Sequence, residues 1–145
     1  MMRPGMRSGT RSGVAAVEFA VLVPLILTLL LGLWEIGRMI ETQQVLTNAA
    51  REGARLAVIS GSTDANVTTT VRNYMQAGQL DNYATATVTI TRNVALTGSD
   101  TGSQVQINYP FQFMVLQPVI QLIDSASTTG TPITMQASAL MRNES

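Results

Sequence analysis

The hydrophobic pattern begins with a long apolar run from Val14 to Trp34. Glu18 is the only charged residue in this run. At a rise of ~1.5 Å per residue, a helix over these positions is ~31 Å long, which matches the ~30 Å hydrocarbon core of a bilayer. We therefore expect one transmembrane helix over 14–34. A cleaved signal peptide fits less well, because the run is long and no small-x-small site follows it in LGLWEIGRMIE.

The helical period continues beyond the apolar run. Apolar or small residues recur at Ile36, Leu46, Ala50, Gly53 and Ala57, and no proline occurs before the turn Ser60-Gly61-Ser62. This spacing predicts a single helix over 14–59, with 35–60 as its extracytoplasmic continuation. The small residues Ala50, Gly53, Ala54 and Ala57 share one face, which we expect to pack on the protein's own sheet, although such a face also permits close approach of another element. Pro24 predicts a kink or a loosened turn.

Residues 61–145 are expected to form a small α+β head. Asp64 is placed to cap a second helix that ends at Gly78 and carries Val67, Val71, Tyr74 and Met75 on one stripe. The period then changes to two in three segments, the second of which follows the loop TGSDTGS. Their apolar positions are Ala84, Ala86, Val88 and Ile90; Val105, Ile107, Tyr109, Phe111 and Phe113; and Ile133, Met135, Ala137, Ala139 and Met141.

Three such strands predict a small three-stranded antiparallel sheet with one apolar face, which the long helix would cover. Pro110 places the second strand at a sheet edge or at a bulge. The segment Met114 to Ile123, MVLQPVIQLI, is apolar without a clear period. It is interpreted as a short helix interrupted by Pro118, as additional core or as a partner patch, and core is favoured.

The amino-acid composition excludes several classes of function. The 145 residues correspond to about one domain, and the formal net charge of zero removes the main argument for a nucleic-acid partner. The chain has no Cys, His or Lys, which excludes disulfides, thiolate or imidazole metal sites and the common nucleophile–base pairs. The aspartates of the head are scattered among turn residues. We therefore expect no enzyme activity, no cofactor and no metal.

The distribution of charge predicts the orientation in the membrane. Arg3, Arg7 and Arg11 precede the apolar run without an acidic residue, whereas Glu35, Arg38 and Glu41 after it sum to minus one. The positive-inside rule then places residues 1–13 in the cytoplasm and the head on the opposite side of the membrane. Trp34 would lie at the membrane–water interface on the side of the head.

The start of the apolar run carries a resemblance to a known family. A basic leader that ends in Gly13 and is followed by VAAVEF resembles the processing site of bacterial prepilins. The resemblance implies cleavage between Gly13 and Val14 by a prepilin peptidase, with Glu18 and Phe19 as the fifth and sixth residues of the mature chain. Leu46 to Val58, LTNAAREGARLAV, resembles the TadE-like pseudopilins of the tight-adherence (Flp) pilus.

This resemblance implies a minor subunit or assembly factor of a Flp type IV pilus, held in the inner membrane and able to enter the pilus. The implied partners are the prepilin peptidase, other pilin or pseudopilin subunits, the inner-membrane assembly platform and membrane lipid. Glu18 would offset the α-amino charge of a neighbouring subunit and so set the assembly register, because a paired carboxylate loses its penalty in apolar surroundings. The alternative is that Glu18 reaches back to the cytoplasmic interface.

Two further questions stay open at this level. Arg51 and Arg55 match the AREGAR part of the family pattern and are four residues apart, so they repel unless a carboxylate faces them; they form a partner face or are solvated, and solvation is favoured. The rival function is a permanently anchored extracytoplasmic binding module for a protein or surface polymer. A third is a component of a secretion machine that uses pilin-like subunits without an extended fibre.

Overall fold

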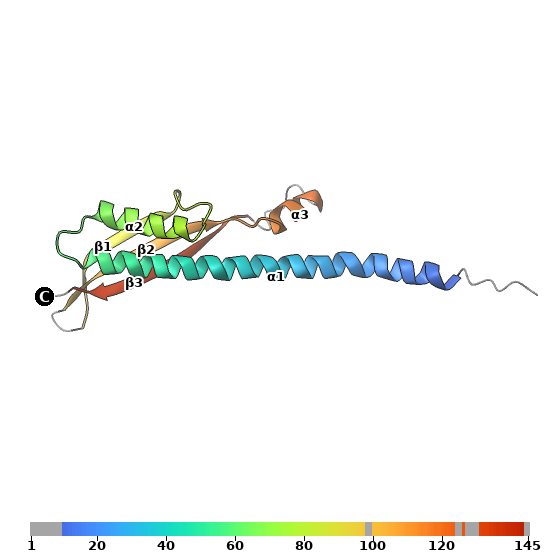
Figure 1. The fold of residues 1–145 in the computed structure, drawn as a ribbon, viewed down its shortest axis with the longest axis horizontal. Helices are drawn as coiled ribbons and strands as arrows, with labels where there is room; N and C mark the ends of the chain where they lie inside the picture. The colour runs from blue at the N-terminus through green and yellow to red at the C-terminus, as the bar shows by residue number, and fades with distance from the viewer. Residues whose placement is uncertain (1–9, 98–99, 124–125, 127–130, 144–145) are drawn as a thin grey trace, which may run out of the picture.

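The computed structural model describes residues 10–97, 100–123, 126 and 131–143, so the predicted leader residues before Thr10 lie outside the described part. The elements follow the order α1 (Thr10–Ala57), α2 (Asp64–Ala77), β1 (Thr87–Ala95), β2 (Thr101–Phe111), α3 (Leu116–Ile123) and β3 (Ile133–Arg142). The predicted α+β class, with a long N-terminal helix, a second short helix and a three-stranded antiparallel sheet, is confirmed (Figure 1).

Helix α1 is a single rod. Its C-terminal half packs in the head, and its N-terminal half projects away from it (Figure 1). Its 48 residues give a length of ~72 Å. The continuous helix predicted over 14–59 is confirmed in type, although it begins at Thr10 and ends at Ala57. The helix is continuous through Pro24, whose carbonyl accepts a hydrogen bond from the Thr28 hydroxyl at 2.8 Å.

Helix α2 is amphipathic and is capped one residue earlier than predicted. Thr63 has the extended backbone of an N-cap, and its hydroxyl oxygen accepts the Asn66 N–H at 3.2 Å. Asp64 is instead the first helical residue, where its charge suits the positive end of the helix dipole. The buried stripe consists of Val67, Val71 and Met75. Tyr74, predicted on that stripe, is 40% exposed, because it follows Val71 by only three residues and falls at the margin of a narrow face.

Gly78 ends α2 as predicted, but for a reason of packing. Its φ of −78° is open to any residue, and the left-handed conformation falls on Gln79, with φ of 57°. A Cβ at Gly78 would lie 2.5 Å from a methyl carbon of Val45 on α1. The glycine therefore allows the end of α2 to approach α1 closely.

The sheet is antiparallel in the order β1-β2-β3, with Val88 opposite Ile107 and Val105 opposite Ala139. Strand β3 matches the predicted segment. The first two strands extend further toward their connecting loop than predicted. Thr101 pairs with Ala95, so the last three residues of the predicted loop TGSDTGS belong to β2. Strand β1 carries an irregularity between Thr91 and Val94.

Strand β2, which contains Pro110, lies in the centre of the sheet. The prediction that this strand is an edge strand is therefore wrong for the strand as a whole. The last β1 partner of β2 is Asn108, opposite Thr87. At Pro110 the strand has only β3 beside it, with Thr134 opposite. The proline therefore stands where β2 is locally an edge, which is where a residue without an N–H is tolerated.

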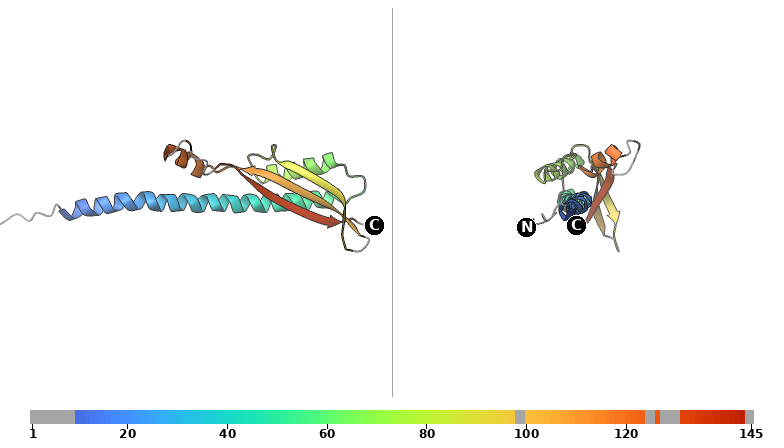
Figure 2. Two further views of the ribbon diagram at one scale, coloured as in Figure 1. Left: turned by 180° about the vertical axis from the view of Figure 1, so that it is seen from behind. Right: turned by 90° about the vertical axis from the view of Figure 1, so that its right-hand side faces the viewer.

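The core lies between the sheet and the two helices, which both cover the same face of the sheet (Figure 2). The predicted small face of α1 packs inward, as expected: Ala50 and Ala54 are fully buried, and a Cβ at Gly53 would lie 2.5 Å from Val71 and 3.3 Å from Val105. Burial of these side chains supplies the main stabilisation of the head. The principal buried residues are Leu46, Ala49, Ala50, Ala54, Ala57, Val67, Val71, Met75, Val105, Ile107, Tyr109 and Phe111.

None of the described side chains of segment 114–123 joins this core, so the favoured interpretation of the segment as core is wrong. Helix α3 lies apart from the sheet, beside the projecting half of α1 (Figures 1 and 2). Met114 is 55% exposed and Val119 is 40% exposed. Pro118 does not interrupt α3, because it stands in the first turn, where backbone N–H groups have no acceptor within the helix.

Candidate functional site

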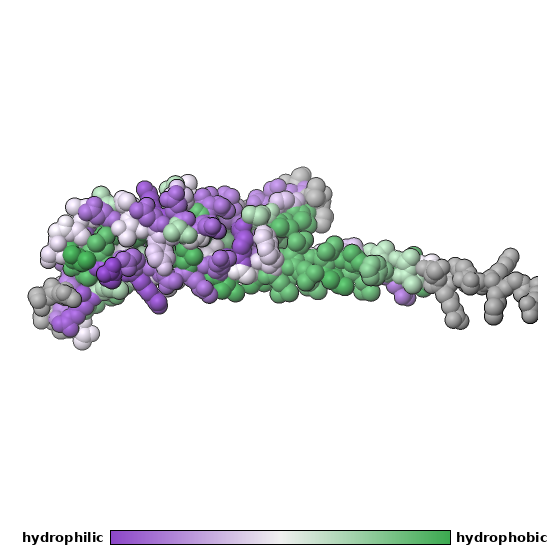
Figure 3. All heavy atoms as spheres, in the orientation of Figure 1, coloured by the Kyte–Doolittle hydropathy of each residue, from purple (hydrophilic) through white to green (hydrophobic). Residues whose placement is uncertain are grey.

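The most prominent feature of the molecule is the bare half of α1. Its most apolar 18-residue window is entirely unburied, and the helix is long and apolar enough, by length and composition, to cross a membrane. In the space-filling view this part is a continuous apolar surface, whereas the head is largely polar (Figure 3). Its large exposed side chains include Val14, Val17, Phe19, Val21, Leu22, Leu25, Ile26, Leu27, Leu29, Leu30 and Leu33.

The predicted processing residues lie at the free end of this rod. Gly13 is in the first turn of α1 and has open space around its Cα. Val14 and Phe19 are 60% and 69% exposed. Glu18 is exposed and forms no ion pair with any residue that the structure describes. It lies one turn, or ~6 Å along the axis, beyond Val14 on the same side of the helix.

Trp34 marks the place where the bare rod meets the head. Its ring is 48% exposed, and the Arg38 guanidinium carbon lies 5.7 Å from the ring centroid. The same guanidinium lies 4.9 Å from the ring centroid of Phe111, at the end of β2. Phe113 meets Phe111 edge to face at 5.4 Å between centroids. Cation–π contacts of this kind connect α1 to the chain that leaves the sheet.

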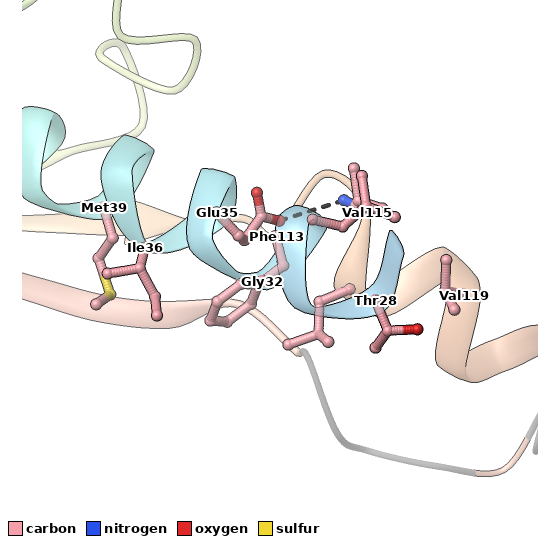
Figure 4. A pocket seen from close by; sticks show the side chains of 10 residues that line it. Thr28, Gly32, Glu35, Ile36, Met39, Phe113, Val115 and Val119 are labelled. Carbon is pink, nitrogen blue, oxygen red and sulfur yellow. Dashed lines mark hydrogen bonds between the residues drawn. The ribbon is translucent and has the colours of Figure 1, made fainter. Parts of the chain in front are cut away.

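Glu35 is the buried acid at this junction, with only 3% of its surface exposed. Its Oε1 accepts the backbone N–H groups of Met114 and Val115, the latter at 3.2 Å (Figure 4). Its Oε2 has no hydrogen-bond partner but lies 3.8 Å from the Arg38 Nε. Arg38 in turn donates to the Gln112 carbonyl. We call Glu35 with the two backbone N–H groups the Glu35 clamp; it fastens the segment before α3 to α1.

Sequence reasoning missed this clamp. In the sequence, Glu35 and Arg38 stand out only as charges that follow the apolar run. The partner of Glu35 is a backbone amide 79 residues away, and such a group leaves no signal in side-chain type or spacing. The nearest available signal was the position of an acid directly after Trp34, which is equally consistent with a solvated membrane edge.

An apolar groove lies between α1 and α3, next to the clamp (Figure 4). Its volume is about 210 Å³. Among the described residues that line it, Glu35 alone is ionisable, and its carboxylate is already engaged by Met114 and Val115. The lining residues are Thr28, Leu31, Gly32, Glu35, Ile36, Met39, Phe113, Val115, Leu116 and Val119.

The two arginines of the AREGAR pattern differ in their surroundings. Arg55 is paired with Glu52, its Nε and Nη2 donating to the carboxylate at 3.1 and 2.7 Å. This pair raises the pKa of Arg55 and lowers the pKa of Glu52. Glu52 is thus the carboxylate that relieves the predicted like-charge repulsion. Arg51 is exposed beside a shallow hollow of α1 and forms no ion pair within the described part of the chain.

The fold and site together define a class: an α+β head on a long helix whose other half is apolar, exposed and of membrane-spanning length. A family model described as TadE-like protein matches residues 13–55, from the predicted processing glycine almost to the end of α1. The predicted resemblance to the TadE-like family is thereby confirmed over this segment. The TadE-like family is not known for enzyme activity. No curated protein and no solved structure matches the chain.

Proposed function

We propose that the chain is a prepilin-peptidase-processed pseudopilin that acts as a minor subunit or assembly factor of a Flp (tight-adherence) type IV pilus. One observation carries the proposal: Gly13, Glu18 and Phe19 stand in the prepilin order at the start of an exposed apolar helix, inside the TadE-like match. The exposed rod supports membrane anchoring before assembly and helix packing with other pilin subunits after it.

The proposed topology follows the distribution of arginine. Residues 1–13 are a cytoplasmic leader, 14–34 cross the inner membrane, 35–60 continue the helix outside and 61–145 form the extracytoplasmic head. The peptidase and the assembly platform of the inner membrane would meet the cytoplasmic end. The head, with its own core, would be displayed on the other side.

The local structure at Gly13 suits cleavage. Glycine in a helix is ~1 kcal/mol less favourable than alanine, and the first turn of α1 lacks intrahelical acceptors for its N–H groups. Unwinding at Gly13 therefore costs little. The absence of a side chain lets a protease approach the backbone.

Glu18 is proposed to pair with the α-amino group that cleavage creates at Val14 of a neighbouring subunit. An unpaired carboxylate in hydrocarbon costs roughly 2.5–3.5 kcal/mol on insertion scales. A subunit whose Glu18 finds an amino group loses that penalty, and a subunit placed one turn out of register does not. This pairing would favour one axial register among the apolar helices.

The first test measures the N-terminal residue and intact mass of the protein from membranes with and without its prepilin peptidase. We expect a peptidase-dependent start at Val14 with the anchor retained, loss of processing in Gly13→Val, and normal processing in Gly37→Val, a helical glycine that also has open space around it. An intact leader under both conditions contradicts the proposal and favours the permanently anchored binding module.

The role of Glu18 is tested separately in Glu18→Gln. We expect processing to be retained and incorporation into the fibre, or fibre number where the chain only aids assembly, to fall at least tenfold. Unchanged pilus formation and incorporation would mean that Glu18 has no part in register.

A further inference from the structure

The segment from Met114 to Ile123 contains no charged residue in 10 positions. An apolar stretch of about 10–14 residues is typically part of a buried core or of an interfacial membrane segment. Met114, Leu116 and Val119 are 55%, 38% and 40% exposed, so these side chains of the stretch do not lie in the core. Of these two environments, the structure therefore favours the membrane interface.

The depth of α3 relative to the membrane follows from its place along α1. The groove between the two helices reaches from Met39 to Thr28 on the α1 side. Thr28 is six residues before Trp34, and at ~1.5 Å per residue it lies ~9 Å closer to the middle of the bilayer. Interfacial helices insert their apolar face by ~5–10 Å. The position of α3 therefore coincides with the outer part of the leaflet on the head side.

The chemistry of the groove suits hydrocarbon and not water. Its walls are apolar apart from Thr28 and Glu35; Thr28 directs its hydroxyl to the Pro24 carbonyl, and Glu35 is engaged in the clamp. Apolar cavities of this kind are poorly hydrated and accept apolar ligands. The α1 wall of the groove is continuous with the exposed apolar surface of the rod (Figure 3).

We propose that α3 is a membrane-contacting helix and that an acyl chain of a membrane lipid occupies the groove between α3 and α1. The proposal rests on the membrane insertion of α1 in the proposed function but on neither leader processing nor pilus assembly. The Glu35 clamp holds α3 at this level, so the head is attached to the bilayer surface at two places, α1 and α3. A second polypeptide in the groove is the competing occupant.

The test uses the full chain in phosphatidylethanolamine/phosphatidylglycerol vesicles. The native chain has no cysteine, so single cysteines carry a fluorescent label at chosen sites. Val119→Cys reports the groove, Leu25→Cys the middle of the span, and Ser138→Cys the exposed polar face of the sheet. Quenchers are nitroxides placed high or deep on lipid acyl chains and iodide in the water.

We expect the Val119 label to be quenched at least twofold more by the shallow than by the deep nitroxide, and at least fivefold less by iodide than the Ser138 label. Gly32→Leu, which fills the floor of the groove, is expected to lower shallow-nitroxide quenching at Val119 at least twofold. Gly37→Leu, at a glycine outside the groove, leaves it unchanged.

Each other outcome overturns the proposal in a distinguishable way. A Val119 label as open to iodide as Ser138, with Leu25 in lipid, overturns the contact of α3 but leaves membrane anchoring intact. A Val119 label shielded from the nitroxides and from iodide assigns the groove to a second copy of this chain. An unchanged signal in Gly32→Leu removes the acyl chain from the groove. A Leu25 label exposed to iodide refutes membrane insertion and the proposed function with it.

Discussion

Gly53 lies at the point where α1 meets both α2 and β2. A Cβ there would stand 2.5 Å from a methyl carbon of Val71 and 3.3 Å from one of Val105. Both neighbours are fully buried, and β-branched side chains are stiff at χ1, so moving either side chain away is costly. The close approach of the three elements thus depends on the absence of one side chain.

Gly53→Ala is therefore expected to lower the free energy of unfolding of the head by about 1–3 kcal/mol, the usual cost of overpacking. The matched control is Gly37→Ala, where a Cβ meets nothing within 4 Å and the gain in helix propensity is up to about 1 kcal/mol. Denaturant unfolding of the full chain in detergent, followed by circular dichroism, measures both. Equal stability of Gly53→Ala and the native chain would show that α2 relaxes around the methyl group.

At the scale of elements, Arg92 of β1 connects the two helices of the head. Its guanidinium donates to the Ala57 carbonyl at 2.6 Å, to the Ser62 carbonyl at 3.0 Å and to the Asp64 carboxylate at 2.8 Å. These acceptors are the last turn of α1, the connecting turn and the first residue of α2. A helix end needs such partners for its free carbonyls, and a planar guanidinium can reach three acceptors at once.

Replacing Arg92 tests this connection. We expect Arg92→Met to cost about 1–2 kcal/mol, a value that allows for the partial exposure of the ion pair, and Arg92→Lys to recover less than half of it, because one ammonium group cannot span the three acceptors. Arg72→Met, at an exposed arginine of α2, should stay within ~0.5 kcal/mol. Urea midpoints at constant m-value give the comparison, and an Arg92→Met midpoint equal to that of Arg72→Met would rule the connection out.

At the scale of the molecule, the Glu35 clamp decides where α3 lies relative to the rod. The core of the head ends before α3, and the described contacts that hold the segment after β2 are those of Glu35 and Arg38 together with the apolar lining of the groove. A buried acceptor that satisfies two backbone N–H groups is costly to remove, since each unsatisfied group loses ~1–3 kcal/mol.

Glu35→Ala is expected to raise hydrogen exchange at Met114 and Val115 about 10–100-fold and to expose 112–123 to protease, while exchange in the sheet stays unchanged. Glu35→Gln keeps an acceptor oxygen and should show the smaller effect of the two. Glu41→Ala, at an exposed acid on the same helix, serves as the control. Uniform exchange changes across the head would instead make Glu35 a residue of global stability.

Much of the architecture could be predicted because it follows from the local periodicity of apolar residues along the chain. The 3.6-residue period of α1, the stripe of α2 and the alternation of β3 each depend on neighbours a few positions apart, and each element appears as predicted apart from its boundaries. The errors fall where two local choices compete. Thr63 and Asp64 are both good caps, and the loop before β2 contained residues equally suited to a turn and to a strand.

The sequence by itself determined α1, α2 and the three strands, the apolar rod of membrane-spanning length and the resemblance around Gly13, because periodicity, hydropathy and motif order are properties of adjacent residues. Only the tertiary structure decided that segment 114–123 leaves the core, that Pro110 stands where β1 no longer reaches, and that Glu35 is buried. The physical reason is that these outcomes depend on backbone groups and packing surfaces brought together from distant parts of the chain. Every residue other than proline carries the same backbone N–H group, so the sequence does not show which of these groups will meet Glu35. Only folding brings Met114 and Val115 to its carboxylate.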